Sequence, residues 1–183
     1  MPCEYRPYIF IVKFKDPLRK RELETLIKIC NSFENKGHYF IFLKPQVIYS
    51  PIQLLSAFLM AKELVEEHKK IKKVSIAFLL FISGQKEIRK AMNVGLSEGD
   101  SETVLVVFSK LGKKALKFLL EEESLKDFFH SIEEAFPRTS LEKIRAFYGI
   151  KEEELKATLS ETKNESILKC ILMRMARVKL EFL

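Results

Sequence analysis

The segment Val74–Ile82 (VSIAFLLFI) constrains the fold of this chain most, because eight of its nine residues are apolar. It is shorter than the roughly 20 residues that cross a membrane, and it is too uniformly apolar for a strand with one face in water. We therefore predict a buried strand in the middle of a sheet. Ser83-Gly84 follows as the expected N-cap of a short basic helix, which Gly95 is expected to end in the left-handed conformation.

Four apolar segments in all have the composition of strands. They are Tyr8–Phe14, Tyr39–Leu43, Val74–Ile82 and Thr103–Phe108. We predict an α+β fold, with a small antiparallel or mixed sheet of about four strands covered by helices. A length of 183 residues is typical of one domain. We therefore expect a single domain (1–183), with the sheet and its covering helices in residues 1–120 and a helical part in residues 121–183 packed on it.

Apolar periodicity and capping signals predict several further helices, most of them in the C-terminal third. Their ranges are Asp16-Pro17 to near Phe33, Pro51 to about Lys69, Ser124–Ala135, Ser140–Tyr148 with Gly149 after it, Glu152 to about Leu159, and Ser166–Lys179. The last helix has its apolar residues on one half of the wheel, so we expect it to pack on the main body. Met173 and Met175 are predicted to be core or adaptable contact residues rather than ligands.

The helix that begins at Pro51 has an unusually wide distribution of apolar residues. The segment Ser50–Gln53 combines an N-cap serine, a proline at the first helical position and a glutamine at the third, which is a capping-box pattern. One apolar stripe suits a helix lying on a sheet, but Leu55, Leu59 and Met60 lie outside it. Either the C-terminal helix covers these residues, or they form an exposed patch that binds another protein.

Positive charge exceeds negative charge, with 32 Lys and Arg residues against 25 Asp and Glu residues and a formal net charge of +7. Such an excess favours polyanionic partners. The candidate RNA-binding residues form two clusters, Lys86, Arg89 and Lys90, and Lys110, Lys113 and Lys114. Each cluster is either a solvated surface or a set of contacts to nucleic-acid phosphates.

No arrangement of catalytic residues occurs in the sequence. The histidines and cysteines lack the spacing of a metal site, because they are scattered at His38, His68, His130, Cys3, Cys30 and Cys170. The sequence also contains no glycine-rich phosphate-binding loop. We predict that the protein is not an enzyme and has no catalytic residues, no cofactor, no metal site and no small-molecule substrate. Because the N-terminus lacks a signal-peptide pattern and no segment is long enough to span a bilayer, we expect a cytoplasmic protein with no membrane partner.

Several segments resemble a known family through their order and spacing. They are VIYSPIQLLSAFLMAKE (47–63), VSIAFLLFISGQKEIRKAMNVGL (74–96), TVLVVF (103–108) after an acidic turn, FYGIKEEEL (147–155) and SILKCILMRMARVKL (166–180). Together they resemble the small TPRKB-like, kinase-binding subunit of the KEOPS tRNA-modification complex, in its archaeal type. Residues 110–140 match least. Residues 85–96 are similar to the family's "QI..A...G" signature with a final apolar residue, and residues 173–176 to the last helix of archaeal members.

The resemblance implies a non-catalytic subunit that binds the kinase/ATPase of KEOPS and engages tRNA, including its single-stranded 3′ CCA end. That complex makes threonylcarbamoyladenosine (t6A) beside the anticodon, with a separate transferase subunit for the chemistry. The two basic clusters would then contact tRNA phosphates. Two positions depart from the family, since members often carry glutamate near Ala77 and an acidic residue near Lys169.

Two other functions remain open on the sequence alone. The first is a protein-interaction subunit without RNA affinity of its own, which rests on Leu55, Leu59 and Met60. The second is a small-molecule enzyme, for which the sequence supplies neither a nucleophile nor a set of metal ligands.

Overall fold

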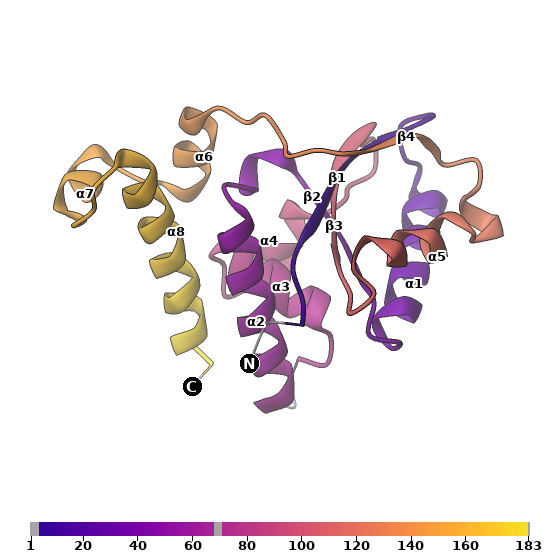
Figure 1. Cartoon of the computed structure of the whole chain (residues 1–183), viewed down its shortest axis with the longest axis horizontal. Helices are drawn as coiled ribbons and strands as arrows, with labels where there is room; N and C mark the ends of the chain where they lie inside the picture. Colours follow the sequence, from indigo (N-terminus) through magenta and orange to yellow (C-terminus); the bar gives the residue numbers. More distant parts are fainter. Residues whose placement is uncertain (1–3, 68–70, 183) are drawn as a thin grey trace. The chain divides into compact units, whose positions relative to one another are not determined.

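The chain is described by a computed structural model that covers residues 4–67 and 71–182 (Figure 1). Its strands are β1 (Tyr8–Phe14), β2 (Tyr39–Leu43), β3 (Glu102–Phe108) and β4 (Phe129–Glu134). Its α-helices are α1 (Lys20–Glu34), α2 (Pro51–Glu67), α3 (Val74–Ser83), α4 (Ile88–Ala91), α5 (Leu116–Leu120), α6 (Leu141–Tyr148), α7 (Glu152–Ala157) and α8 (Lys163–Leu180). Its short 3₁₀ helices are η1 (Pro45–Val47), η2 (Met92–Val94), η3 (Gly112–Ala115) and η4 (Glu123–Leu125). The α+β class predicted from the sequence is confirmed.

The contacts within the chain divide it into two compact units. The sheet unit comprises the chain up to Lys44 together with Gly95–Pro137, and the helical unit comprises Pro45–Val94 together with the chain from Arg138 onward. The single domain expected from the sequence stays a prediction. Cys3, His68 and the predicted helix end at Lys69 lie outside the described residues.

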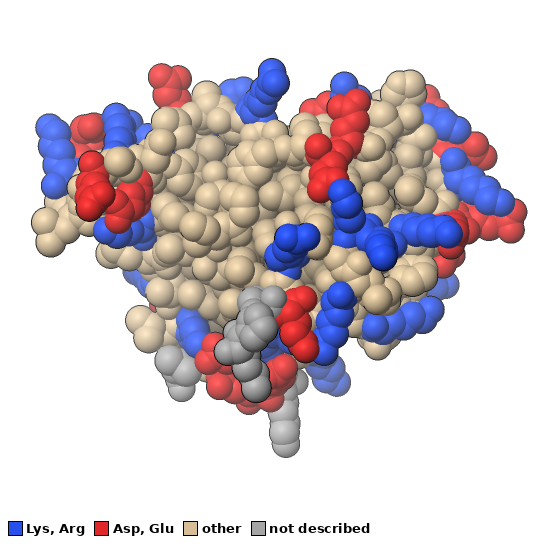
Figure 2. Space-filling model, in the orientation of Figure 1, with Lys and Arg blue, Asp and Glu red and all other residues tan. Residues whose placement is uncertain are grey.

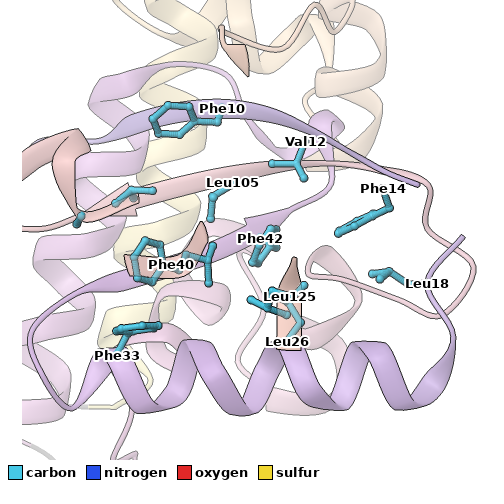
Figure 3. Close-up of a cluster of buried hydrophobic side chains, with 13 residues drawn as sticks. Phe10, Val12, Phe14, Leu18, Leu26, Phe33, Phe40, Phe42, Leu105 and Leu125 are labelled. Carbon is cyan, nitrogen blue, oxygen red and sulfur yellow. The ribbon is translucent and has the colours of Figure 1, made fainter. Parts of the chain in front are cut away.

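The sheet unit is built on an antiparallel sheet in the order β2-β3-β1-β4. Alternate residues of a strand face the same side, and in β1 these are Phe10, Val12 and Phe14. They join one hydrophobic cluster with Leu26 and Phe33 of α1 (Figure 3). The cluster is the core of this unit, and it places α1 against one face of the sheet.

The predicted strand Val74–Ile82 is wrong, because these residues form helix α3. Apolar side chains surround this helix, and it contacts both α2 and α8 within the helical unit. A helix that is buried on all sides shows no amphipathic period, so its sequence cannot be told from that of a buried strand. The helix ends where the sequence predicted a helix start: Gly84 has a φ of 67° and donates its N–H to the carbonyls of Leu80 and Phe81. The short basic helix α4 does follow, but Gly95 lacks the predicted left-handed conformation.

The predicted helix Ser124–Ala135 is also wrong, because the second half of this segment contains the edge strand β4. Leu125, Phe128, Phe129 and Ile132 have helical spacing, but β4 pairs with β1 along the sheet. Cross-strand pairing and burial override such local periodicity. The remaining predicted helices agree with the structure except at their ends; for example, α1 begins at Lys20 rather than at Asp16-Pro17. The short helix α5 was not predicted.

The capping box predicted at the start of α2 is confirmed. The Ser50 hydroxyl accepts the backbone N–H of Gln53 at 3.1 Å, and Gln53 Oε1 accepts the backbone N–H groups of Tyr49 and Ser50 at 2.8 and 3.4 Å. These bonds satisfy donors that a helix N-terminus leaves without a partner. They also fix the side chain of Gln53, which is completely buried.

The amide group of Gln53 extends this cap into a buried network. Its Nε2 donates to the carbonyl of Val47 at 3.0 Å and to the hydroxyl of Tyr148 at 2.6 Å. The Tyr148 hydroxyl lies 2.7 Å from the carbonyls of both Val47 and Ile82, and its single proton is donated to one of them at a time. One polar cluster therefore joins η1, α2, the end of α3 and the end of α6.

The substitution Tyr148→Phe is expected to lower the free energy of unfolding by about 1 to 3 kcal/mol, because it leaves buried groups of Gln53 and Ile82 without a partner. Urea unfolding at pH 7 measures this. Tyr49→Phe is the matched control, since the Tyr49 hydroxyl donates to Asn164 in an exposed position and its loss should cost about 0.5 kcal/mol. Equal losses in the two variants would contradict the role of the network.

Candidate functional site

A surface groove of about 840 Å³ lies in the helical unit between α2, α7 and α8. Its apolar lining comes from Met60, Ala157, Leu159, Leu172, Met173 and Ala176. In Figure 2 the surface left of centre, over α2 and α8, shows few Lys, Arg, Asp or Glu side chains. Uncovered apolar surface of this kind marks interaction sites on water-exposed domains.

The apolar residues of α2 outside its main stripe are partly covered by α8 and partly exposed, and the binding of a partner by the exposed ones stays a prediction. Helix α8 packs on α2, and Leu55 and Met60 are half-buried. Leu59 nevertheless stays 45% exposed, and Ile52 of the same helix is 60% exposed. The predicted partner-binding residues Leu55, Leu59 and Met60 therefore border a surface that α8 covers incompletely, and Met60 lines the groove itself.

The charged groups in the lining of the groove are paired within the chain. The Lys169 ammonium lies 2.6 Å from the Glu165 carboxylate and donates to the carbonyl of Leu159 at 2.7 Å. The carboxylate of Glu154 is held by Arg174. A partner that enters the groove thus meets apolar side chains without having to neutralise either charge, which spares the cost of burying an unpaired ion.

Arg174 uses all five of its N–H donors inside the helical unit. Its Nε donates to the carbonyl of Tyr148 at 2.6 Å, and Nη1 and Nη2 donate to the two carboxylate oxygens of Glu154 at 2.6 and 2.8 Å. The remaining donors reach the carbonyls of Cys170 and Gly149 at 3.0 and 3.2 Å. This side chain therefore joins α8 to α7 and to the C-terminal end of α6, where a positive charge is favourable.

The pairing shifts the titration of both partners. Hydrogen bonds from Arg174 lower the pKa of Glu154 below its ordinary value of 4.5, although partial burial acts in the opposite direction. The same hydrogen bonds raise the pKa of Arg174, which stays charged. Because the folded state has the lower carboxyl pKa, the pair stabilises the fold above pH 4.5, and this stabilisation is lost as the pH falls through the folded-state pKa.

The first predicted RNA-binding cluster lies on α4 and the loop before it. The Lys86 ammonium is 3.5 Å from the carboxylate of Glu181, and that of Lys90 is 2.7 Å from the carboxylate of Glu87. Arg89 is exposed, and it has no ion pair among the residues that the structure describes. The three cations thus remain at the surface of the helical unit, close together in the chain, and their role in binding RNA stays a prediction.

The second cluster belongs to the sheet unit, at the end of β3 and in η3. Lys110 pairs with Glu4 at 2.7 Å, and Lys113 pairs with Glu134 at 2.9 Å. Lys114 is exposed and has no ion pair within residues 4–67 and 71–182. Exposed ion pairs contribute roughly 0 to 1 kcal/mol, so a phosphate can replace the carboxylate in each of them.

Apart from Met60, the residues that line the groove were not among the predicted partner-binding residues, and Leu159 is one of them. Arg174, which holds Glu154 of the lining, was not predicted to be part of the site either. Leu159 is 91% exposed in the loop between α7 and α8. Its position between Thr158 and Ser160 was the sequence signal that could have placed it in a loop. Met173 is 62% exposed and so is not a core residue, whereas Met175 is buried. Arg174 lies on the polar half of the predicted wheel, and no sequence pattern distinguishes it from its exposed neighbour Arg177.

Two findings concern the described residues alone. None of their His, Cys, Asp and Glu side chains form a group of three that would hold a metal ion. Nor does any helix in this part of the chain combine the length and the hydropathy needed to cross a membrane.

An apolar groove whose charged side chains are paired within the chain is typical of protein-binding surfaces. The family follows from the sequence comparison: the model of the family described as kinase binding protein CGI-121 matches residues 12–178, and the chain belongs to this family. The resemblance to the TPRKB-like subunit is thereby confirmed. A search of curated proteins found no match.

The two positions that depart from the family have different surroundings. Ala77 is completely buried in α3, so it offers no side chain to a partner. Lys169 lines the groove and is held by Glu165 and Leu159. Of these two departures, only the one at Lys169 lies on the candidate partner surface.

The substitution Glu154→Gln is expected to lower the free energy of unfolding at pH 7 by about 1 to 3 kcal/mol, because a charge-assisted hydrogen bond is lost. Urea unfolding at pH 7 and at a pH below the lowered pKa of Glu154 measures it, and the deficit should shrink at the lower pH, because the ion pair is lost there. Glu153→Gln is the control, since Glu153 is an exposed neighbour on α7. A deficit of the same size at both pH values would mean that the ion pair is not its cause.

Proposed function

We propose that this protein is a non-catalytic subunit that binds the kinase/ATPase of a KEOPS-type complex and recruits tRNA, including its 3′ CCA end, for t6A modification. Its membership of the kinase binding protein CGI-121 family supports the kinase half. The observation that carries the proposal is the apolar groove between α2, α7 and α8. Under this proposal other subunits catalyse the modification reaction, and the protein acts in the cytoplasm.

The kinase subunit is assigned to the groove on the basis of exposure and charge. Met173 and Leu159 are the most exposed large apolar side chains of its lining, at 62% and 91%. Large apolar side chains that become fully desolvated dominate the affinity of many protein interfaces. The lining also has its charges paired internally, so that the expected partner surface is apolar at its centre.

The tRNA half rests on the two basic clusters. Arg89 and Lys114 are exposed cations, and Lys86, Lys90, Lys110 and Lys113 are in exposed ion pairs. Phosphate contacts from such side chains supply sequence-independent, salt-dependent affinity. The second candidate function is a protein-interaction subunit without RNA affinity, and the internal pairing of four of these six cations favours it.

The substitution Met173→Glu is expected to weaken binding of the kinase subunit at least tenfold, or about 1.4 kcal/mol, because it places a charge in an apolar interface. The fold should be unaffected, since this side chain is exposed. Titration calorimetry with the purified kinase subunit measures the affinity, and urea unfolding checks the fold. Leu180→Glu is the control, as Leu180 is a 68% exposed residue of the same helix outside the groove. Equal affinity of the two variants would place the kinase elsewhere.

Binding of the protein to full-length tRNA and to tRNA trimmed of its CCA end can be compared by titration at two salt concentrations. Trimming is expected to weaken binding at both. Affinity for each RNA should fall as salt rises, because phosphate contacts release counterions. Arg89→Gln tests the first cluster, with Arg138→Gln as the exposed control. Equal binding of both RNAs would indicate only a generic basic surface, and no binding would favour the subunit without RNA affinity.

A further inference from the structure

We propose that strand β4 pairs with β4 of a second copy of this chain, so that two sheets of four strands join into one of eight. The sheet has two edges, β2 and β4. Every residue of β2 is buried, whereas none of the six residues of β4 is. Within the part of the chain that the structure describes, β1 is the one strand that pairs with β4. An uncovered edge of this kind is a template for a further strand.

The ladder between β1 and β4 shows which backbone groups of β4 are left for a second strand. Ala135 donates its backbone N–H to the carbonyl of Ile9 at 3.2 Å, and the register is regular from Ser131 to Glu134. In an antiparallel ladder, residues that bond to the partner strand alternate with residues whose N–H and C=O point away from it. The N–H and C=O of Ile132 and Glu134 therefore point away from β1, toward the free edge.

The charges of β4 select one register for the pair. When the pair is centred on Ile132, each Ile132 exchanges both backbone hydrogen bonds with Ile132 of the second copy, and Ser131 lies opposite Glu133 of the second copy. Centring on Glu133 would place two carboxylates directly opposite each other, which is destabilising. Centring on Ser131 would leave Glu133 opposite Phe129. The register about Ile132 therefore suits the charges of this strand best.

Lys13 gives this register its charge complementarity. It lies opposite Ser131 on the neighbouring strand β1, so the two side chains share a face of the sheet. Its ammonium is 3.8 Å from the carboxylate of Glu102, and both side chains are about half exposed, so this ion pair contributes little. Because Ser131 is small, Lys13 can reach across it to Glu133 of the second copy, two strands or roughly 10 Å away. The two-fold symmetry of the pair makes this contact twice.

Ile132 gives the pair an apolar contact on the other face of the sheet. It is half-buried and packs against the core cluster beneath α1. In the proposed pair the two Ile132 side chains lie side by side at the two-fold axis, and each covers part of the surface that the other exposes to water. Because one pair of strands buries little area, the dimer is expected to be weak and reversible.

The test is sedimentation equilibrium of the purified chain alone, from about 1 µM to about 1 mM. The wild-type chain is expected to change from monomer to dimer across this range. Ser131→Glu and Glu133→Lys are each expected to weaken the dimer about fivefold or more, because each creates two contacts between like charges. An equal mixture of the two variants should recover the wild-type affinity, since the new carboxylate of one then faces the new ammonium of the other.

Glu24→Lys is the matched control for Glu133→Lys, because it makes the same change in net charge at an exposed position of α1 in the same unit. Ser131→Glu lowers the net charge of +7, so a change in general repulsion between copies would strengthen the dimer rather than weaken it. Urea unfolding verifies that each variant is folded. Hydrogen exchange gives a second measurement, since the amides of Ile132 and Glu134 should exchange more slowly at high protein concentration.

Three outcomes would overturn the inference: a chain that stays monomeric over the whole range, a mixture that does not recover the wild-type affinity, or a Glu133→Lys variant that dimerises as tightly as Glu24→Lys. Slow exchange of the two amides only after another protein is added would place a foreign strand at this edge, which also overturns self-pairing. None of these outcomes tests the proposed function, because neither the kinase nor tRNA is present.

Discussion

The hydroxyl of Tyr148 is the interaction on which the helical unit depends most. It lies within 2.7 Å of two backbone carbonyls, from η1 and from the end of α3, and it accepts a bond from the cap residue of α2. A buried polar network of this kind is stabilising only when every member has its partner. Since the backbone carbonyl of the same residue accepts from Arg174, one tyrosine connects the ends of α3 and α6 to α8. The groove borders elements that this network positions.

The candidate surface combines fixed support with charges that are paired within the chain. Arg174 and Glu154 hold α7 and α8 together at the groove, and Met173, the residue before Arg174 on α8, exposes its side chain to solvent. Residues that bind a partner well are those whose backbone is already fixed, because less conformational entropy is lost on association. The family to which the chain belongs is described as kinase-binding, and an apolar surface of this kind suits a protein partner.

The fold could be predicted from the sequence wherever local signals agreed with the tertiary environment. The serine, proline and glutamine at the start of α2 identified its cap correctly, and Gly149 ends α6 as predicted. The fold class was predicted correctly, but one helix was predicted as a strand and one strand was predicted as a helix. A helix packed on several sides, α3, had lost the periodicity that marks helices, while the edge strand β4 retained a helical spacing by chance. Burial by other elements decided both segments, and neither effect is visible in a local window.

The groove was predictable only in part. Met60, which lines it, was singled out in the sequence from an apolar surplus on α2 that a helical wheel reveals. The contribution of Leu159 and the internal pairing of Lys169 depend on how the loop between α7 and α8 returns to the helix. Such contacts join a loop to a helix, so neither the composition nor the apolar periodicity of the sequence predicts them.

Each of the two units consists of two stretches of chain, and this has a consequence for synthesis on the ribosome. The helical unit begins at Pro45 but is completed only by the stretch that follows Arg138. During translation α3 therefore emerges long before α8, which contacts it in the finished protein. A nascent chain of this kind exposes its most apolar segment for much of its synthesis, which is the situation in which chaperones bind. The order in which the polypeptide is made, and not only its final stability, thus sets how vulnerable this protein is to aggregation.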